Sequence, residues 1–86
     1  MNETVRFNFT NKTVLVFGGS RGIGKEVCIQ FKKAGALVYC ISRTDIDHEE
    51  ITHLKCDISQ EKNINSVLDK FEKIDYIVIF MKHFRK

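Results

Sequence analysis

Three short runs of mostly apolar, β-branched or aromatic residues divide this chain, at positions 13–17, 36–41 and 75–80. Runs without a regular polar alternation are typical of strands that a parallel sheet covers on both faces. Between the first two runs, apolar residues recur at helical spacing from Ile23 to Ala34, with lysines on other faces. The order strand, helix, strand predicts a right-handed βαβ unit and therefore a parallel sheet.

A second helix is predicted over Gln60–Phe71, where apolar residues form a stripe at helical spacing. The members of this stripe are Ile64, Val67, Leu68 and Phe71. Ser59 is the expected N-cap of this helix, and Glu61 lies in its first turn. The helix returns the chain to the run at 75–80. A reversal of direction after the third strand predicts the strand order 3-2-1-4, with a topological switch point above strands one and four.

A glycine-rich segment lies where the first strand ends and the first helix begins. Gly18 permits a tight turn, Gly22 lets a phosphate approach the backbone, and Gly24 lets the helix pack closely on its strand. The N–H groups at the start of that helix, with the positive end of its dipole, then face the phosphates. The segment therefore predicts a nucleotide site at the switch point.

The segment Phe17-Gly-Gly-Ser-Arg-Gly-Ile-Gly24 resembles the glycine fingerprint of the short-chain dehydrogenases/reductases. Its residue sequence is especially similar to that of 3-oxoacyl-carrier-protein reductases and related carbonyl reductases. Leu54–Ile58 resembles the family's Asp-aliphatic pair after the third strand, and Lys73–Val78 resembles the fourth strand and its approach. The resemblance implies a partial Rossmann fold of the α/β class, with a parallel sheet of about four strands and two main helices on opposite faces. The residues that it implies for dinucleotide contact are Gly18, Ser20, Arg21, Gly22, Ile23, Gly24, Asp57 and Ile58, with Asp57 on adenine.

The end of the second strand bears on the choice of cofactor. An NAD site usually offers a carboxylate to the ribose hydroxyls, whereas an NADP site offers positive charge to the 2′-phosphate. Here the expected acidic position is Ser42, which Arg43 follows, and Arg21 lies in the glycine turn. Two arginines can bind a phosphate with charge-assisted hydrogen bonds, so we expect NADP(H) rather than NAD(H). The alternatives stay open: Asp45 and Asp47 as NAD-type acceptors, and Arg43 as an ordinary solvated charge.

The family's reaction centre has no counterpart in this sequence. The Asn-Asn-Ala-Gly that ends the family's fourth strand is replaced from Ile79 onward, and neither Tyr39 nor Tyr76 has the catalytic lysine four positions later. We therefore expect residues 1–86 to be the N-terminal dinucleotide-binding part of a short-chain oxidoreductase, truncated after the fourth strand, without catalytic residues and inactive alone. A free-standing nucleotide-binding or regulatory module is one alternative. A non-functional remnant is the other.

Composition bears mainly on compartment and partners. The net charge is +3, and the basic residues at 82–86 predict a solvated tail, with neither nucleic acid nor a membrane as partner. No apolar run could cross a bilayer and the start lacks the form of a secretion signal, so we expect a cytoplasmic protein. The cysteines fit reduced, structural thiols: Cys28, Cys40 and Cys56. A metal site from His48, His53 and Cys56 is disfavoured, because an odd spacing on a strand directs side chains to opposite faces.

Two features are expected to weaken the sheet. Segment 44–50 is polar and holds at most one helical turn, so one face should be poorly covered. The fourth strand, Tyr76–Phe80, is uncharged and β-prone, and as an outer strand it would expose its edge. We expect self-association, or a partner that covers this edge.

Overall fold

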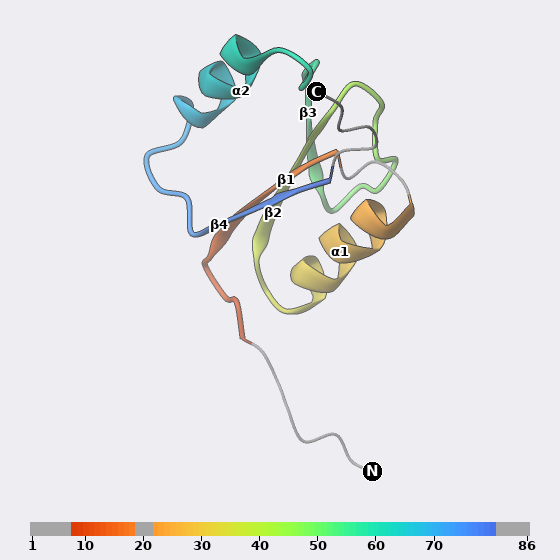
Figure 1. Cartoon of the computed structure of the whole chain (residues 1–86). Coiled ribbons are helices and arrows are strands. Elements are labelled where there is room, and N and C mark those ends of the chain that lie inside the picture. Colours follow the sequence, from red (N-terminus) through yellow and green to blue (C-terminus); the bar gives the residue numbers. More distant parts are fainter. Residues whose placement is uncertain (1–7, 19–21, 81–86) are drawn as a thin grey trace.

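The computed structural model describes residues 8–18 and 22–80, and Figure 1 shows a twisted sheet with α1 and α2 on opposite sides. Within these residues the sheet has four parallel strands in the order β3-β2-β1-β4. The elements along the chain are β1 (Thr13–Phe17), α1 (Gly22–Lys33), β2 (Leu37–Ser42), β3 (Thr52–Lys55), α2 (Glu61–Leu68) and β4 (Tyr76–Ile79). The predicted class, strand order and placement of the helices are confirmed.

The three apolar runs form strands whose ends lie within one residue of those predicted. β1 occupies 13–17, β2 begins and ends one residue later than 36–41, and β4 is one residue shorter at each end than 75–80. β1 lies between β2 and β4, and all of its residues after Thr13 are buried. The unbroken apolar run thus corresponds to the strand with neighbours on both sides and cover on both faces.

Helix α2 is shorter than the predicted helix over Gln60–Phe71, and that prediction was wrong at both ends. Gln60, rather than Ser59, is the N-cap residue, and its side chain makes no capping hydrogen bond. At the other end, the N–H of Phe71 donates to the carbonyl three residues earlier, so the chain tightens into a turn. Phe71 still packs over the sheet, because its ring stacks edge-to-face on Tyr39 with centroids 4.8 Å apart.

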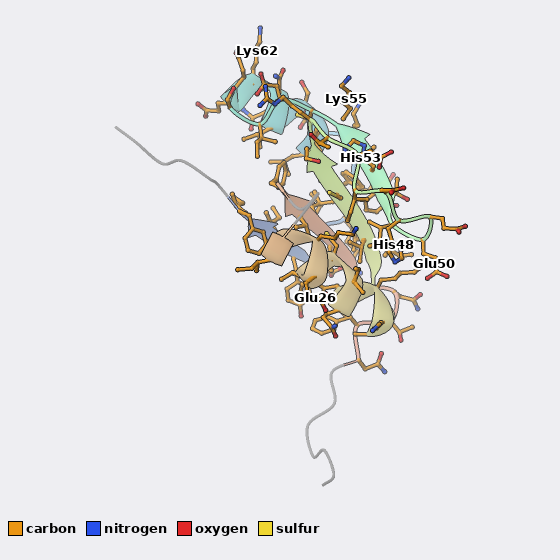
Figure 2. All side chains as sticks on the ribbon, turned by 90° about the vertical axis from the view of Figure 1, so that its right-hand side faces the viewer. Glu26, His48, Glu50, His53, Lys55 and Lys62 are labelled. Carbon is orange, nitrogen blue, oxygen red and sulfur yellow. The ribbon has the colours of Figure 1, made fainter. Side chains whose placement is uncertain are left out.

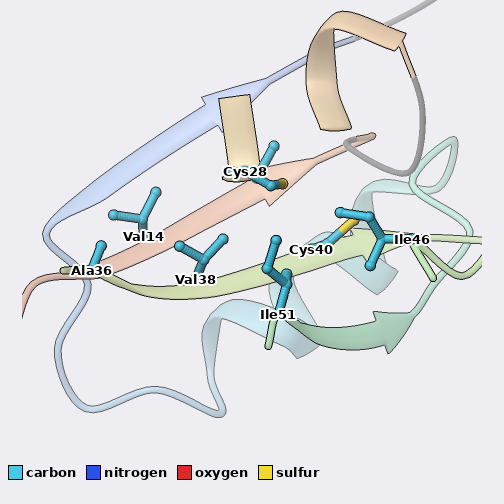
Figure 3. Packing of buried hydrophobic residues seen from close by; sticks show 8 residues of the cluster. Val14, Cys28, Ala36, Val38, Cys40, Ile46 and Ile51 are labelled. Atoms are coloured by element: carbon cyan, nitrogen blue, oxygen red, sulfur yellow. The ribbon is translucent and has the colours of Figure 1, made fainter. Parts of the chain in front are cut away.

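Alternate residues of β1 face the two helices, as the period of a strand requires. Val14 and Val16 pack with Cys28 of α1 in one core cluster, part of which Figure 3 shows. Leu15 and Phe17 belong to a second cluster, to which α2 contributes Ile64, Val67 and Leu68 and the turn after it contributes Phe71. The central strand therefore supplies apolar residues to both layers.

The segment between β2 and β3 contains no helix, yet it covers its face of the sheet. Ile46 and Ile51 are 1% and 4% exposed and join the cluster on the α1 side. Two isoleucines on an irregular loop thus do what the apolar stripe of a helix would do. The expectation that this face is poorly covered was wrong for this reason.

Strand β4 forms one edge of the described sheet. Tyr76, Ile77 and Ile79 are 45%, 47% and 58% exposed, although their partners on β1 are buried. Soluble proteins usually protect such an edge with charge, proline or a covering segment. The four residues of β4 provide no charge and no proline.

Candidate dinucleotide site

The carboxyl ends of the strands meet at one edge of the sheet, because all its strands run in the same direction. Backbone hydrogen bonds join these ends: Gly18 N donates to Ile41 O at 2.8 Å, Phe80 N to Phe17 O at 2.8 Å, and Cys56 N to Ser42 O at 3.0 Å. The residues that follow β1, β2 and β3 therefore lie in one region. Parallel α/β sheets bind their ligands in this region, at the point where the strand order reverses.

Gly18 and Gly22 both have positive φ, at 86° and 64°, but their surroundings differ. A Cβ added to Gly18 would overlap the carbonyl oxygen of Phe80. At Gly22 none of the described atoms lies within 4 Å of the position that a Cβ would take. As far as the described residues go, the backbone at Gly22 is therefore open, which is the condition for bringing a phosphate to the start of α1.

The first turn of α1 has a buried side and an exposed side. Gly24 is buried, as close packing of the helix requires, whereas Ile23 is 75% exposed. An isoleucine so exposed beside an open backbone offers an apolar contact to a ligand. Ser20 and Arg21, which the resemblance also implies for dinucleotide contact, lie outside the described residues.

Ser42 ends β2 with its side chain directed into the protein. The residue is 5% exposed, and its hydroxyl donates to Thr44 O at 2.6 Å. A hydroxyl has a single proton, so Ser42 in this geometry has none left to donate to a ribose or a phosphate. Its side chain instead shapes the turn that carries Arg43.

Arg43 and Asp57 lie at the same edge of the sheet, and their charges interact. Hydrogen bonds from the hydroxyl and the amide of Ser59 hold the pKa of Asp57 below its usual value, and the exposed Arg43 adds to this effect. Both hydrogen bonds go to Oδ1, at 2.7 Å and 3.0 Å, and none of the described residues donates to Oδ2. Because the Ser59 hydroxyl is used on Asp57, it does not cap α2.

Ile58 anchors the turn that presents Asp57. It is half-buried and packs with the core cluster on the α2 side. The structure thus brings the glycine turn, Arg43 and Asp57 to one edge of the sheet, and it places Ser42 and Ile58 beneath them.

His53 has a contact that the sequence analysis missed. Its Nε2 lies 3.0 Å from Ser42 O and 3.2 Å from Ser42 Oγ, and its Nδ1 lies 4.0 Å from Asp45 Oδ1. The strand register pairs His53 with Cys40, which places its side chain on the face that Cys40 shares with Ser42. The available signal was therefore alternation along β2 and β3, but it could be used only once their register was known.

The structure directs His53 and Cys56, two of the residues considered for a metal site, toward different neighbours. Cys56 packs with the α2-side cluster, whereas His53 points toward Ser42 and the loop after β2. Within the described residues, no group of three or more potential ligands could hold a metal ion. Figure 2 shows His53 and His48 on the side of the molecule where this loop runs.

Two hollows lie outside the predicted contacts. One, of about 510 Å³, borders the loop between β2 and β3 and is lined by Asp45, Asp47, His48, Glu49, Ile51 and His53. The other, of about 540 Å³, runs along α1 toward Phe9 and Ala34, away from the carboxyl ends of the strands. Neither is lined by a residue of the predicted contact set, although the first contains Asp45 and Asp47, the alternative NAD-type acceptors.

Both tyrosines pack as structural residues. Tyr39 stacks on Phe71, and Tyr76 stacks on Phe9 with ring centroids 5.4 Å apart. Arg43 and Phe80 stand four positions after them, where a Tyr-x-x-x-Lys pair requires lysine. Neither tyrosine therefore belongs to such a pair.

The parallel sheet of order 3-2-1-4, with a glycine turn at its switch point, defines a Rossmann-like α/β protein. A family model described as short chain dehydrogenase matches residues 12–80. The chain belongs to the short-chain dehydrogenase/reductase family. None of the helices in the described part combines the length and the apolar character needed to span a membrane.

Curated relatives match only part of the chain. An L-xylulose reductase of Caenorhabditis elegans is 49% identical over 39 residues, which are 45% of this chain and 16% of that protein. A short chain dehydrogenase of Pseudocercospora fijiensis is 56% identical over 43 residues, covering 50% of this chain and 14% of its own length. An uncharacterized oxidoreductase of Schizosaccharomyces pombe is 27% identical over 74 residues, and the match covers 73% of this chain and 28% of that protein. The chain thus spans less than a third of the length of these relatives.

Solved structures share the fold. The aldohexose dehydrogenase of Thermoplasma acidophilum, in ligand-free form, superposes with a TM-score of 0.74 at 25% identity, over 84% of this chain and 30% of that one. A short chain dehydrogenase of Leptospira borgpetersenii with bound NAD+ superposes with a TM-score of 0.62 at 25% identity, over 84% and 32%. The described sheet and helices therefore match about a third of each of these longer chains.

Proposed function

We propose that this chain is the dinucleotide-binding part of a short-chain oxidoreductase and that it prefers NADP(H). The observation that carries the proposal is the position of an exposed Arg43 directly after β2, at the same edge as Gly22 and Asp57. The open backbone at Gly22 fits a pyrophosphate, since a side chain there would occupy the path of approach. The second carboxylate oxygen of Asp57 fits an amino group of adenine, since an ionised carboxylate is an acceptor only.

The preference for NADP(H) rests on charge at the end of β2. The residue there is Ser42, whose hydroxyl is committed to Thr44, so no carboxylate stands at that position to accept from the ribose hydroxyls. Arg43 supplies a guanidinium, which can bind a 2′-phosphate through two hydrogen bonds. Asp45 is the nearest carboxylate along the chain, and its Oδ1 accepts from Asp47 N at 3.1 Å. That bond ties it to its own loop.

A bound nicotinamide supplies the hydride chemistry, and the residues of this chain bind and orient the dinucleotide. Ile23 provides an apolar contact beside the phosphates, and Ile58 fixes the turn that presents Asp57. Ser20 and Arg21 belong to the same proposal through the family resemblance. We further propose that the 86-residue chain binds without turnover, because its two tyrosines are packed on phenylalanines and lack the lysine of the family's catalytic pair.

Calorimetric titration with NADP and with NAD tests the proposal directly. We expect NADP to bind more tightly, and we expect Arg43→Ala to lower its affinity about tenfold while leaving NAD nearly unchanged, as loss of a charge-assisted hydrogen bond implies. Lys33→Ala removes an exposed charge at the far end of α1 and is the matched control. Equal affinity of the unmodified chain for the two cofactors contradicts the preference, and the absence of any binding contradicts the function.

We propose, finally, that the chain self-associates through β4. The exposed apolar residues of this strand and its uncharged edge support the proposal. The partner strand is that of a second copy, since identical edges are available in any solution of the protein.

A further inference from the structure

His53 contacts the end of β2 at two atoms of one residue. Its Nε2 lies 3.0 Å from the carbonyl oxygen of Ser42 and 3.2 Å from the hydroxyl oxygen. The same carbonyl accepts from Cys56 N at 3.0 Å, so two donors from the β3 side hold it. His53 is 15% exposed by its side chain, so the ring is largely sheltered from solvent.

These contacts decide which nitrogen of the ring carries the proton. A carbonyl oxygen is an acceptor only, so Nε2 must be the N–H that faces Ser42 O. The Ser42 hydroxyl donates to Thr44 O and can accept from the same N–H. In neutral His53 the bare nitrogen is then Nδ1, which faces Asp45 Oδ1 at 4.0 Å. The imidazole thus has a defined tautomer, fixed by the end of β2.

The segment held in this way carries the charge proposed to select the cofactor. Arg43 directly follows Ser42, and Asp45 lies two positions further on. Asp45 Oδ1 also accepts from Asp47 N, where the backbone has a positive φ of 60°. Without the ring, the Ser42 carbonyl would keep only the N–H of Cys56 as a donor, and the start of the loop would lose its side-chain contact with β3. The direction of Arg43 would then be less defined.

We propose that His53 is a positioning residue for phosphate selectivity: its Nε2–H holds Ser42 so that the loop after β2 presents Arg43 to the 2′-phosphate of a dinucleotide. This inference rests on the proposed function, because it concerns the same site. His53 itself does not touch the ligand. Its effect on affinity is therefore confined to ligands that carry the 2′-phosphate. A residue that places another N–H donor beside Ser42 should restore that affinity.

Titration with adenosine 2′,5′-bisphosphate and with adenosine 5′-monophosphate measures the phosphate-dependent part of binding. For His53→Leu we expect the affinity for the bisphosphate to fall about three- to tenfold, the equivalent of one hydrogen bond, with the monophosphate nearly unchanged. His53→Gln places an amide N–H near the position of Nε2 and should retain most of the preference. His48→Leu is the matched control, because His48 contacts Glu50 N and not Ser42.

If His53 has only a structural role, His53→Leu should lower the affinities for both nucleotides together, and His53→Gln should not restore the affinity for the bisphosphate. Either result overturns the inference. If His53→Leu does not fold, His53→Asn replaces it, because the asparagine amide is one methylene too short to reach Ser42. We expect His53→Asn to lose affinity for the bisphosphate and to keep its affinity for the monophosphate. Nitrogen-15 NMR of the unmodified chain gives an independent readout, and the Nδ1–H tautomer there would also overturn the proposal. The proposed function fails separately, if the unmodified chain binds neither probe or does not prefer the bisphosphate.

Discussion

The α-carbon of Gly18 faces the carbonyl oxygen of Phe80 so closely that the two backbones leave no space for a side chain between them. The contact joins the end of β1 to the end of β4, where Phe80 N also donates to Phe17 O at 2.8 Å. This is the switch point of the sheet. The first glycine of the turn is therefore required by the packing of two strands as well as by its own backbone conformation.

Gly18→Ala should destabilise the chain more than Gly22→Ala does. Both positions have positive φ, which costs an alanine about 1–2 kcal/mol. At Gly18 the new Cβ also overlaps the Phe80 carbonyl, so the total should reach roughly 2–5 kcal/mol. Denaturant unfolding of both variants measures the difference. Equal destabilisation would show that Phe80 can move aside at little cost.

Asp75 and Thr13 join the opposite ends of the same two strands. Thr13 N donates to Asp75 Oδ2 at 2.8 Å, and Asp75 N donates back to Thr13 O at 2.9 Å. The hydrogen bond from Thr13 holds the pKa of Asp75 below its usual value, and Lys73 and Lys12 act in the same direction. Because the pKa is lower in the folded than in the unfolded chain, the carboxylate stabilises the fold above the unfolded value.

Stability should therefore fall as the pH drops below about 4, the usual value for an aspartate, toward the lower folded pKa of Asp75. Asp75→Ala should lower the melting temperature at neutral pH and flatten this acid limb, because it removes the group that titrates. Asp69→Ala, at an exposed position just after α2, is the control. Thermal melts at a series of pH values test the prediction, which would be wrong if the Asp75 variant kept the full acid dependence.

Much of the fold could be predicted from sequence, because the chain is locally consistent. Apolar runs became strands within one residue, and the change from strand to helix at the glycines was correctly placed. The errors arose where tertiary contacts override local preference. Ser59 has the chemistry of an N-cap but uses its hydroxyl on Asp57, and the end of α2 is followed by a turn that lets Phe71 reach Tyr39.

The parts of the candidate site that depend on backbone conformation could be predicted from the sequence. The parts that depend on the register between β2 and β3 could not. Glycine spacing located the turn, and the residues after β2 and β3 were expected at one edge because the strands are parallel. The inward direction of Ser42 and the role of His53 depend on which residues of β2 and β3 lie opposite each other. The burial of the loop between β2 and β3 also depends on contacts distant in sequence, since Ile46, within the polar segment 44–50, and Ile51, directly after it, pack onto the sheet.

The three thiols should react at different rates. A hydrogen bond to Cys40, together with burial, raises the pKa of Cys28, and neither of these two residues is exposed to solvent. Cys56 is half-buried, and desolvation and the neighbouring Asp57 raise its pKa. A thiolate is the reactive form, so we expect Cys56 to react first but more slowly than a model thiol. Labelling with a chromogenic disulfide at pH 8, in native buffer and in denaturant, will show whether one thiol or more is accessible in the folded chain.

The purified 86-residue chain should not oxidise NADPH with any carbonyl substrate. Binding and orientation of a cofactor should not suffice for turnover, because neither Tyr39 nor Tyr76 has the lysine four positions later that completes the family's proton-donating pair, and both are packed on phenylalanines. Loss of absorbance at the NADPH band, followed across a panel of aldehydes and ketones, is the measurement. Turnover by material whose mass and purity have been verified would contradict the prediction.

Strand β4 should mediate self-association, and one charge on it should suppress this. Ile79 is 58% exposed on an edge strand, whereas Leu37 is 49% exposed on β2, a strand that is paired on both sides. A lysine on an edge strand disfavours pairing with another edge, because the charge would lose water on association. Ile79→Lys should therefore shift the chain toward monomer in size-exclusion chromatography with light scattering, and Leu37→Lys should not. The α1 side of the sheet is covered, because Ile46 and Ile51 are buried there, so we expect the Ile79→Lys variant to fold as a monomer. A cooperative thermal transition of this variant would demonstrate that it folds. A monomeric unmodified chain, or an equal response to both lysines, would show that association does not proceed through β4.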